Sequence, residues 1–224
     1  MTPITEVRTA PVTYPLAEPF AIATGTQAEA VTMRVEVMDA AGHRGIGEAA
    51  PVPHVVGHDL DDTLAATEAL LPELEGADPT AIRRLHRDLW AHPAANVSAI
   101  HALETALLDL CCRRWAIPMA AYLGGPPQPV RTDMTIPIVD PAAAAARART
   151  ATDAGFDQLK IKTGGTVDAD LARVRAVADA APSATLTVDA NQGWTVDATL
   201  AFAAGLEDAG VQLRLLEQPP AADE

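Results

Sequence analysis

The sequence predicts an α/β protein in which an N-terminal α+β domain is followed by parallel βα units. Three observations predict this fold class. Residues 1–50 alternate polar and apolar side chains as strands do, and residues 61–115 repeat apolar side chains at helical spacing. From residue 134 to residue 217, short strand patterns alternate with helical patterns, which is typical of a parallel sheet.

The composition indicates a globular protein with a small-molecule partner. The 224 residues are 49% hydrophobic and 21% charged, which is enough to bury a core. The formal net charge of −14 argues against nucleic acid and anionic membrane as partners, because both require clustered Lys and Arg. No apolar run is long enough to cross a membrane, and residues 1–7 lack signal-peptide features, so we expect a cytoplasmic protein.

The two cysteines are expected to be buried and unpaired. Cys111 and Cys112 are adjacent within a helical pattern, where neighbouring side chains point away from each other. Zinc sites space their cysteines more widely, so we expect neither a disulfide nor a metal site here. This pattern fits a reducing compartment.

The N-terminal domain is expected to cover residues 1–123 and to begin with a strand meander. Alternation is clearest at residues 31–37, and a turn at residues 39–42 leads to a second strand at residues 45–48. A Gly-Pro-rich linker at residues 124–127 ends the domain.

Three helices are expected between the meander and the linker, at residues 61–71, 79–90 and 96–115. Asp78 is expected to cap the second helix, with Pro79 at its first position. The third helix carries an apolar stripe that should pack on the meander. Its members are Ile100, Leu103, Leu107, Leu110 and Cys111.

The second domain, residues 130–224, repeats a strand and a helix three times and then begins a fourth strand. The strands are expected at residues 134–139, 158–162, 185–189 and 212–217, and the helices at residues 141–154, 167–181 and 196–209. Such units build either a doubly wound sheet or an eight-stranded barrel, and periodicity alone does not separate the two. The chain ends at Glu224 with no helix after the fourth strand.

Charged and polar residues recur where the strands of this repeat end. Lys160 and Lys162 end the second strand, Asp189 and Asn191 end the third, and Glu217 ends the fourth. Because alternate strand residues share a face, each pair points the same way. The ends of neighbouring parallel strands therefore present two cations and two anions to one small volume, the usual place for an active site in a βα barrel.

Simpler interpretations apply to each residue taken alone. Taken alone, Asp189 is equally compatible with a cap of the helix that follows it, and the two lysines with surface charges. However, Leu159 and Ile161 indicate a buried strand. Two ammonium groups on one buried face should repel, and repulsion and desolvation would lower a lysine pKa toward that of a general base.

At these motifs the sequence resembles the muconate-lactonizing subgroup of the enolase superfamily, and within it the dipeptide epimerases, such as the L-Ala-D/L-Glu epimerases. The motifs are Lys160–Lys162, Asp189–Trp194 and Leu216–Pro219, together with Gly47–Pro51 and Asn96–Glu104 in the first domain. The resemblance extends over the whole chain. It implies an N-terminal capping domain followed by about four strands of a TIM-like (β/α) barrel, and a complete protein that forms a homo-oligomer.

The resemblance also implies a magnesium-dependent epimerase or racemase that abstracts the α-proton of a carboxylate substrate, most simply a dipeptide. Asp189 and Glu217 match metal ligands, and Mg²⁺ would stabilise the enediolate. Lys162 matches the lysine that moves the proton. Lys160 matches a companion that holds the substrate carboxylate and depresses the pKa of its neighbour. Asn191 matches a polar residue beside the metal, and Thr135 matches a substrate contact.

Several features depart from this pattern. The family places a third carboxylate and an opposite-face lysine on later strands, so a chain ending at Glu224 is expected to be inactive alone. In alanine–glutamate epimerases a basic residue reads the acidic side chain, whereas Phe20–Thr26 offers Gly25, so a neutral or hydrophobic dipeptide is expected. His54 and His58 are candidates to border the substrate. The turn Thr163–Gly165 resembles a phosphate loop only loosely.

Three alternatives to a dipeptide epimerase stay open. o-Succinylbenzoate synthase and N-acylamino-acid racemase use the same metal and lysines, so an N-acyl amino acid is a second candidate substrate. A non-catalytic fragment belongs to a different class. A flavodoxin-like binding domain would not explain the paired lysines or the large first domain.

Overall fold

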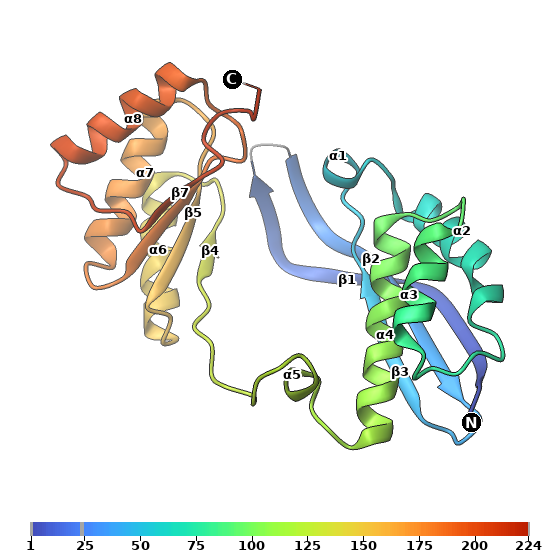
Figure 1. The fold of residues 1–224 in the computed structure, drawn as a ribbon. Helices are drawn as coiled ribbons and strands as arrows, with labels where there is room; N and C mark the ends of the chain where they lie inside the picture. The colour runs from blue at the N-terminus through green and yellow to red at the C-terminus, as the bar shows by residue number, and fades with distance from the viewer. Residues whose placement is uncertain (1, 23–24, 224) are drawn as a thin grey trace. The chain divides into compact units, whose positions relative to one another are not determined.

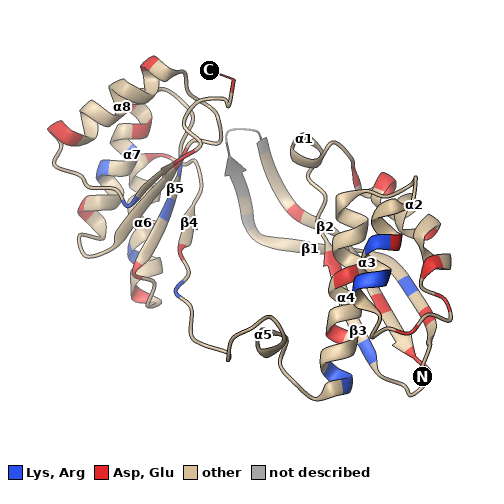
Figure 2. Ribbon diagram, viewed as in Figure 1, with Lys and Arg blue, Asp and Glu red and all other residues tan. Residues whose placement is uncertain are grey.

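The computed structural model describes residues 2–22 and 25–223 and divides into two compact units. One unit consists of Met1–Pro15 and Glu29–Gln128, and the other of Leu16–Ala28 and Pro129–Glu224. Asp and Glu, red in Figure 2, outnumber Lys and Arg, blue, by 30 to 16 and occur in both units. Within the described residues, no helix has both the length and the apolar character needed to cross a membrane.

A three-stranded sheet forms the base of the first unit (Figure 1). Its strands are β1 (Ile4–Ile22), β2 (Gly25–Asp39) and β3 (Arg44–Ala49), in the order β1-β2-β3. β2 and β3 are antiparallel, with Met38 opposite Arg44 and Met33 opposite Ala49. The predicted meander is therefore correct, although β2 extends beyond residues 31–37 at both ends.

Helices follow the strands of this unit along the chain. They are α1 (Pro53–Val56), α2 (Leu60–Leu70), a 3₁₀ turn (Leu71–Glu73), α3 (Ile82–Ala91), α4 (Val97–Trp115) and α5 (Met119–Tyr122). Asp59 caps α2 by accepting the backbone N–H of Asp62, and Asn96 caps α4 by accepting that of Ala99. These caps set the starts of both helices within one residue of prediction.

The predicted start of α3 is wrong. The helix begins at Ile82 rather than at Pro79, and its N-cap, Ala81, makes no side-chain cap. Asp78 instead accepts the backbone N–H of Thr80 at 3.0 Å and the Thr80 hydroxyl at 2.8 Å. This local turn engages the carboxylate that the sequence assigned to the helix, so the helix begins later.

The core of the first unit lies between α4 and the sheet. All five residues of the predicted stripe on α4 are buried. Two glycines of β3 allow a close approach: a Cβ added at Gly45 would lie 2.1 Å from the Ala106 carbonyl oxygen, and one at Gly47 would lie 1.9 Å from that of Ala102. Only glycine permits this contact between helix and strand backbones.

The second unit is a parallel sheet of four strands in the sequential order β4-β5-β6-β7. The strands are β4 (Met134–Ile136), β5 (Gln158–Lys162), β6 (Thr185–Asp189) and β7 (Leu215–Glu217). Helices α6 (Pro141–Asp153), α7 (Val167–Ala180) and α8 (Val196–Asp208) connect them and lie along the sheet in Figure 1. Sequential strand order is that of a barrel wall, which confirms the predicted partial barrel.

Two strands are shorter than predicted. β4 ends at Ile136 because Pro137 follows, and proline has no N–H to continue the ladder. β7 begins at Leu215 rather than at residue 212. Just before the strand, the Arg214 N–H donates to the Leu186 carbonyl at 2.8 Å. β5 and β6 have the predicted boundaries.

Candidate active site

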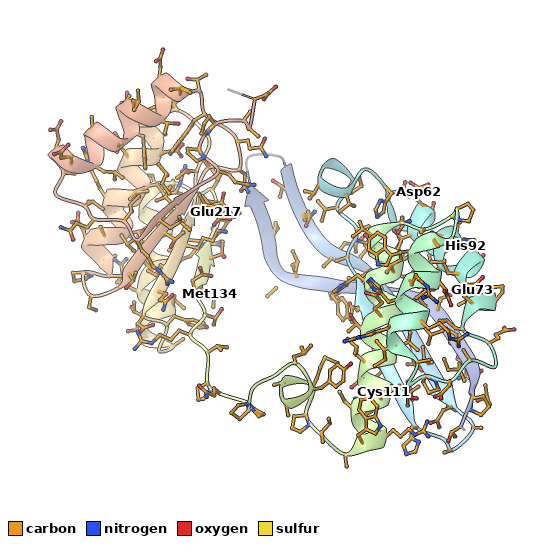
Figure 3. All side chains as sticks on the ribbon, viewed as in Figure 1. Asp62, Glu73, His92, Cys111, Met134 and Glu217 are labelled. Atoms are coloured by element: carbon orange, nitrogen blue, oxygen red, sulfur yellow. The ribbon has the colours of Figure 1, made fainter. Side chains whose placement is uncertain are left out.

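The site lies where β5, β6 and β7 end. Lys162 is in register with Asp189, and Asp189 with Glu217, so these three residues form one row across the sheet. Lys160 is in register with Thr135 on β4, one pleat further back on the same face. Figure 3 labels Met134 at the start of β4 and Glu217 at the end of β7. Parallel pairing therefore brings together residues that are far apart in sequence.

Four charged side chains form a single cluster at this edge. Lys160 Nζ donates to Glu217 Oε2 at 2.8 Å and lies 2.9 Å from Asp189 Oδ2. Lys162 Nζ donates to the same Asp189 oxygen at 2.7 Å. The side chain of Asp189 is 1% exposed and that of Lys162 is 11% exposed, whereas that of Glu217 is 35% exposed. The cluster is thus buried at Asp189 and open toward Glu217.

These two lysines are the only lysines of the chain. Every other basic residue that carries a fixed charge is arginine, which stays protonated and cannot act as a base. The chain therefore places its only primary amines on side chains side by side at one strand end. Lysines that served only to keep the surface soluble would not be expected to lie together at one strand end.

Asn191 completes the cluster through an unusual backbone. Its Oδ1 accepts from Lys162 Nζ at 2.8 Å, and its own N–H donates to Asp189 Oδ1 at 3.0 Å. Asn191, Gln192 and Gln218 all have positive φ, at 47°, 64° and 42°. Left-handed conformations are costly for such residues and concentrate at functional sites. The loops after β6 and β7 are therefore held in a specific, strained shape.

The electrostatic environment corrects one expectation from the sequence. Burial by itself favours the neutral amine of Lys160, but hydrogen bonds to Glu217 and Asp189 outweigh burial and raise its pKa above the ordinary value. The prediction that the paired lysines depress one another's pKa is therefore wrong for Lys160. It counted the two cations but not the carboxylates that the fold places between them.

Asp189 shows the complementary effect. Burial alone would raise its pKa, but hydrogen bonds from Lys162, Lys160 and the Asn191 amide lower it. Asp189 does not cap the following helix, because the N-cap of α8 is Thr195, whose side chain accepts from Ala198. The alternative interpretations of Asp189 as a cap and of the lysines as surface charges are thus excluded.

The oxygen atoms of this site suit a hard cation. Asp189 Oδ2 and Glu217 Oε2 both lie within 2.9 Å of one ammonium nitrogen, so two carboxylates already converge on one positive charge. Carboxylate and amide oxygens are the donors that Mg²⁺ prefers. Among the described residues, no group of three or more His, Cys, Asp or Glu side chains is arranged to hold a metal. Asp189 and Glu217 therefore offer two carboxylate ligands for a metal ion, with the Asn191 side chain beside them.

Other predicted site residues are placed with less detail. Thr135 is half-buried and pairs with Lys160, which puts it on the face of the cluster. The His58 ring lies 2.8 Å from Ser98 Oγ in the first unit. The side chain of His54 and those of residues 20–25, including the Gly25 position, lie outside the described part of the structure. The roles assigned to the site residues stay predictions.

A buried ion pair behind the cluster was missed by sequence reasoning. Asp170 and Arg173 on α7 are 0% and 6% exposed, and they contact each other through Asp170 Oδ1 and Arg173 Nη1. Asp170 Oδ2 accepts the backbone N–H groups of Gly164 at 3.0 Å and Gly165 at 2.8 Å. The glycine turn that resembled a phosphate loop therefore binds a carboxylate of its own chain. Charges at i and i+3 on a helix usually face solvent, so periodicity gave no signal.

Comparison with known proteins agrees with this geometry. Residues 4–124 match the family described as mandelate racemase / muconate lactonizing enzyme, N-terminal domain. Residues 143–224 match the family described as enolase C-terminal domain-like. One match thus lies in the N-terminal part of the chain and the other in its C-terminal part.

Curated relatives are named as epimerases of dipeptides. The aromatic dipeptide epimerase of Herpetosiphon aurantiacus is 43% identical over 93% of this chain and 59% of its own length. The hydrophobic dipeptide epimerase of Citrifermentans bemidjiense is 37% identical over 92% of this chain and 57% of its own length. The chain thus spans less than two thirds of the length of these relatives.

Solved structures give the same result. The dipeptide epimerase of Enterococcus faecalis, complexed with Mg and the dipeptide L-Leu-L-Tyr, superposes with a TM-score of 0.93 at 33% identity, over 99% of this chain and 62% of that one. On the family matches, which together cover residues 4–124 and 143–224, this chain belongs to the mandelate racemase/muconate lactonizing enzyme family of the enolase superfamily.

Proposed function

We propose that the protein is a magnesium-dependent epimerase that removes and returns the α-proton of a dipeptide, with Lys162 as a proton-transferring group. The observation that carries this proposal is the cluster itself. The only two lysines of the chain share the buried carboxylate of Asp189 at the edge where parallel βα units place their active sites.

Lys162 is the group best placed to move a proton. Its ammonium is held between Asp189 Oδ2 and Asn191 Oδ1, so its direction is fixed by two acceptors. General acid–base catalysis requires this kind of positioning before it requires a particular pKa. In the proposed reaction Lys162 takes the α-proton from, or delivers it to, one face of the substrate, and inversion requires a second acid–base group on the opposite face.

Asp189 and Glu217 are proposed to hold the metal through the oxygens that converge on Lys160. When bound, Mg²⁺ neutralises the negative charge that develops on the substrate carboxylate as the α-proton leaves. A substrate carboxylate would also attract the Lys160 ammonium. We assign Lys160 to binding rather than to proton transfer, with Thr135 beside it in the sheet and Asn191 beside Lys162.

We propose a neutral or hydrophobic dipeptide as the substrate. Gly25 stands where a basic residue would be needed to read an acidic side chain, and the relatives described above are named for aromatic and hydrophobic dipeptides. An N-acyl amino acid is the second candidate, because the same lysines and carboxylates can serve it. We further propose a cytoplasmic, homo-oligomeric protein, in keeping with two buried free cysteines and the acidic composition.

Proton NMR in D₂O tests the proposal directly. The intact protein is incubated with Mg²⁺ and L-Leu-L-Tyr, and loss of the α-proton signal is followed together with the appearance of a diastereomer. Formation of the diastereomer should depend on Mg²⁺ and should fall by a factor of about 10³ or more in Lys162→Ala, since a general acid–base group contributes about 10²–10⁴-fold, whereas exchange from the opposite face should persist.

Arg175→Met is the matched control. Arg175 lies on α7 and is exposed, and its guanidinium donates to the Gly205 carbonyl at 2.9 Å, away from the cluster. Its exchange rate should stay within about twofold of the unmodified protein. Formation of the diastereomer at an unchanged rate in Lys162→Ala would exclude Lys162 as a proton-transferring group, and exchange of N-acyl amino acids alone would replace the dipeptide assignment.

A further inference from the structure

A buried polar network lies behind the lysines and reaches every strand end of the second unit. Its centre is Asp170, which is fully buried in the first turn of α7. One carboxylate oxygen, Oδ2, accepts the N–H groups of Gly164 and Gly165, at the turn that leaves β5. The same oxygen lies 3.2 Å from Trp194 Nε1, which follows β6.

Arg173 extends the network to the other side of β5. Its Nε donates to the Val139 carbonyl at 2.7 Å, just beyond β4. Its Nη1 contacts Asp170 and also donates to the carbonyl of Lys162, at 3.4 Å. The guanidinium therefore links the end of β4 to the backbone of the proposed base itself.

Trp194 carries the network to the last strand. Its Nε1 also donates to the Gly165 carbonyl at 3.2 Å, and its backbone N–H donates to the Pro219 carbonyl, after β7, at 3.2 Å. The loops after β5 and β6 meet closely at Gly193, where an added Cβ would lie 2.6 Å from the Gly164 Cα. Four strand ends are thus tied to one ion pair.

We propose that the Asp170–Arg173 pair is a positioning device for Lys162, and this inference rests on the proposed function. A buried ion pair is weak evidence for stability, because desolvation offsets the attraction between its charges. A pair that contacts the Lys162 carbonyl and the amides of Gly164 and Gly165 instead fixes where the ammonium stands relative to Asp189 and Asn191. A displacement of about 1 Å at such a group can reduce a rate about 100-fold.

Two substitutions remove the network to different extents. Asp170→Asn removes the charge but keeps an oxygen acceptor, so the Gly164 and Gly165 amides lose only part of their bonding. Trp194→Phe removes the Nε1 donor together with part of the indole but keeps an aromatic ring against Phe202, whose centroid lies 4.4 Å from that of Trp194, so it serves if Asp170→Asn does not fold.

The controls separate positioning from stability. Asp39→Asn makes the same chemical change in the first unit, at a buried carboxylate that also accepts two backbone N–H groups. Arg175→Met alters α7 without touching a strand end. Neither residue contacts the lysine cluster.

The readout uses the fact that the chain has two lysines. With ¹³C at the lysine ε-carbon, the NMR spectrum of this chain contains two lysine signals, assigned with Lys160→Arg. Asp170→Asn and Trp194→Phe should move or broaden the Lys162 signal, while both controls leave it in place. In the intact protein, Asp170→Asn should lower kcat for α-proton exchange about 10- to 100-fold with KM changed less than threefold.

The outcomes distinguish this inference from the proposed function. If the unmodified protein exchanges no α-proton of any dipeptide, the proposed function fails. The positioning role is then tested separately, by whether Asp170→Asn and Trp194→Phe move or broaden the Lys162 NMR signal. If Asp170→Asn and Asp39→Asn lose similar stability and the Lys162 signal and kcat are unchanged in both, the ion pair is structural only and the inference is overturned.

Discussion

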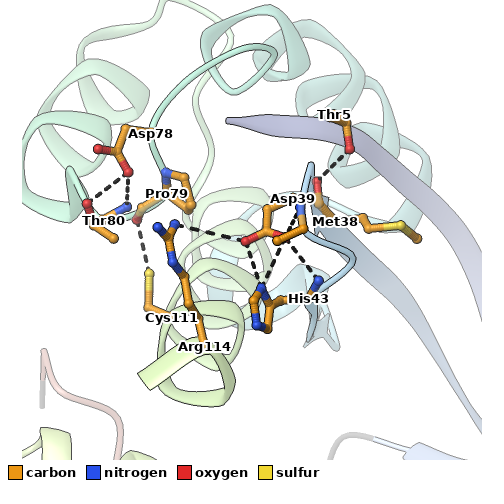
Figure 4. A network of polar contacts seen from close by, with 10 residues as sticks. Thr5, Met38, Asp39, His43, Asp78, Pro79, Thr80, Cys111 and Arg114 are labelled. Atoms are coloured by element: carbon orange, nitrogen blue, oxygen red, sulfur yellow. Dashed lines mark hydrogen bonds and ion pairs between the residues drawn. The ribbon is translucent and has the colours of Figure 1, made fainter. Parts of the chain in front are cut away.

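The two units bury charge for different purposes. In the first unit, the buried carboxylate of Asp39 makes its hydrogen bonds within one turn. Its Oδ1 accepts the backbone N–H groups of Ala41 and His43, and the His43 ring lies beside the carboxylate (Figure 4). In the second, Asp170 and Asp189 bind groups from several strand ends. Buried charge closes a local turn in one unit and organises a site in the other.

The largest expected effect tests the tight backbone contact of the first unit. Gly47→Ala would place a Cβ 1.9 Å from the Ala102 carbonyl oxygen, where both neighbours are backbone and cannot turn aside. We expect a loss of about 3 kcal/mol or more in the free energy of unfolding, measured by urea denaturation. Gly125→Ala, which has nothing within 4 Å of the new Cβ, should change it by less than about 0.5 kcal/mol. Equal effects of the two substitutions would contradict the close contact.

The second effect concerns acid stability. Burial alone would raise the pKa of Asp39, but hydrogen bonds from His43 and Ala41 lower it. A carboxyl whose pKa is lower in the folded state contributes stability above its unfolded pKa of about 3.9, and this is lost as pH falls through the folded value. Arg114 Nη1 lies 4.0 Å from Asp39 Oδ2.

Asp39→Asn should therefore cost about 2 kcal/mol at pH 7 and progressively less below pH of about 4. Urea denaturation at a series of pH values measures the difference between the two proteins. A difference that stays constant from pH 7 down to pH 2 would show that the charge of Asp39 does not contribute.

The third effect belongs to the lysine cluster. Lys160 holds the two carboxylate oxygens that are proposed to bind Mg²⁺, so its ammonium competes with the metal. Lys160→Met should tighten Mg²⁺ binding about tenfold, which corresponds to about 1.4 kcal/mol. Titration calorimetry measures this, with Arg175→Met as the control that leaves affinity unchanged. Weaker binding in Lys160→Met would indicate that the lysine arranges the carboxylates rather than occupying their site.

The features that the sequence predicted correctly are those that depend on neighbouring residues or on equivalent positions in the repeat. The boundaries of β5 and β6 were correct because Leu159 and Ile161 alternate with the lysines. The cluster followed from equivalent positions in a repeat, and needed no side-chain geometry. Asp78 was misassigned because a turn and a helix compete for the same carboxylate over two or three residues.

The network around Asp170 and the raised pKa of Lys160 were beyond the reach of pattern reasoning. Both depend on which side chains meet across strands, and the identities of Asp170 and Arg173 alone indicate a solvent-facing helix turn. Sequence reasoning located the charges at the strand ends but could not tell which opposite charges neutralise them.

The smallest expected effect compares two buried threonines, one in each unit. Both Thr67 and Thr163 are 0% exposed. Thr67 donates its hydroxyl to the Thr63 carbonyl at 2.8 Å, whereas Thr163 Oγ1, next to Lys162, has no hydrogen-bond partner in the described part of the chain. Valine has nearly the same shape as threonine, so each substitution removes a hydroxyl and little else.

Thr67→Val should therefore cost about 1 kcal/mol, the net value of a typical hydrogen bond. Thr163→Val should be neutral or stabilise by up to about 1 kcal/mol, because an unpaired buried hydroxyl already pays its desolvation cost in the folded state. Both are measured by urea denaturation with unchanged slopes. A loss of about 1 kcal/mol or more in Thr163→Val would show that the hydroxyl is bonded after all, for example to an ordered water. In that case the second unit, even next to its proposed base, satisfies its buried polar atoms as fully as the first.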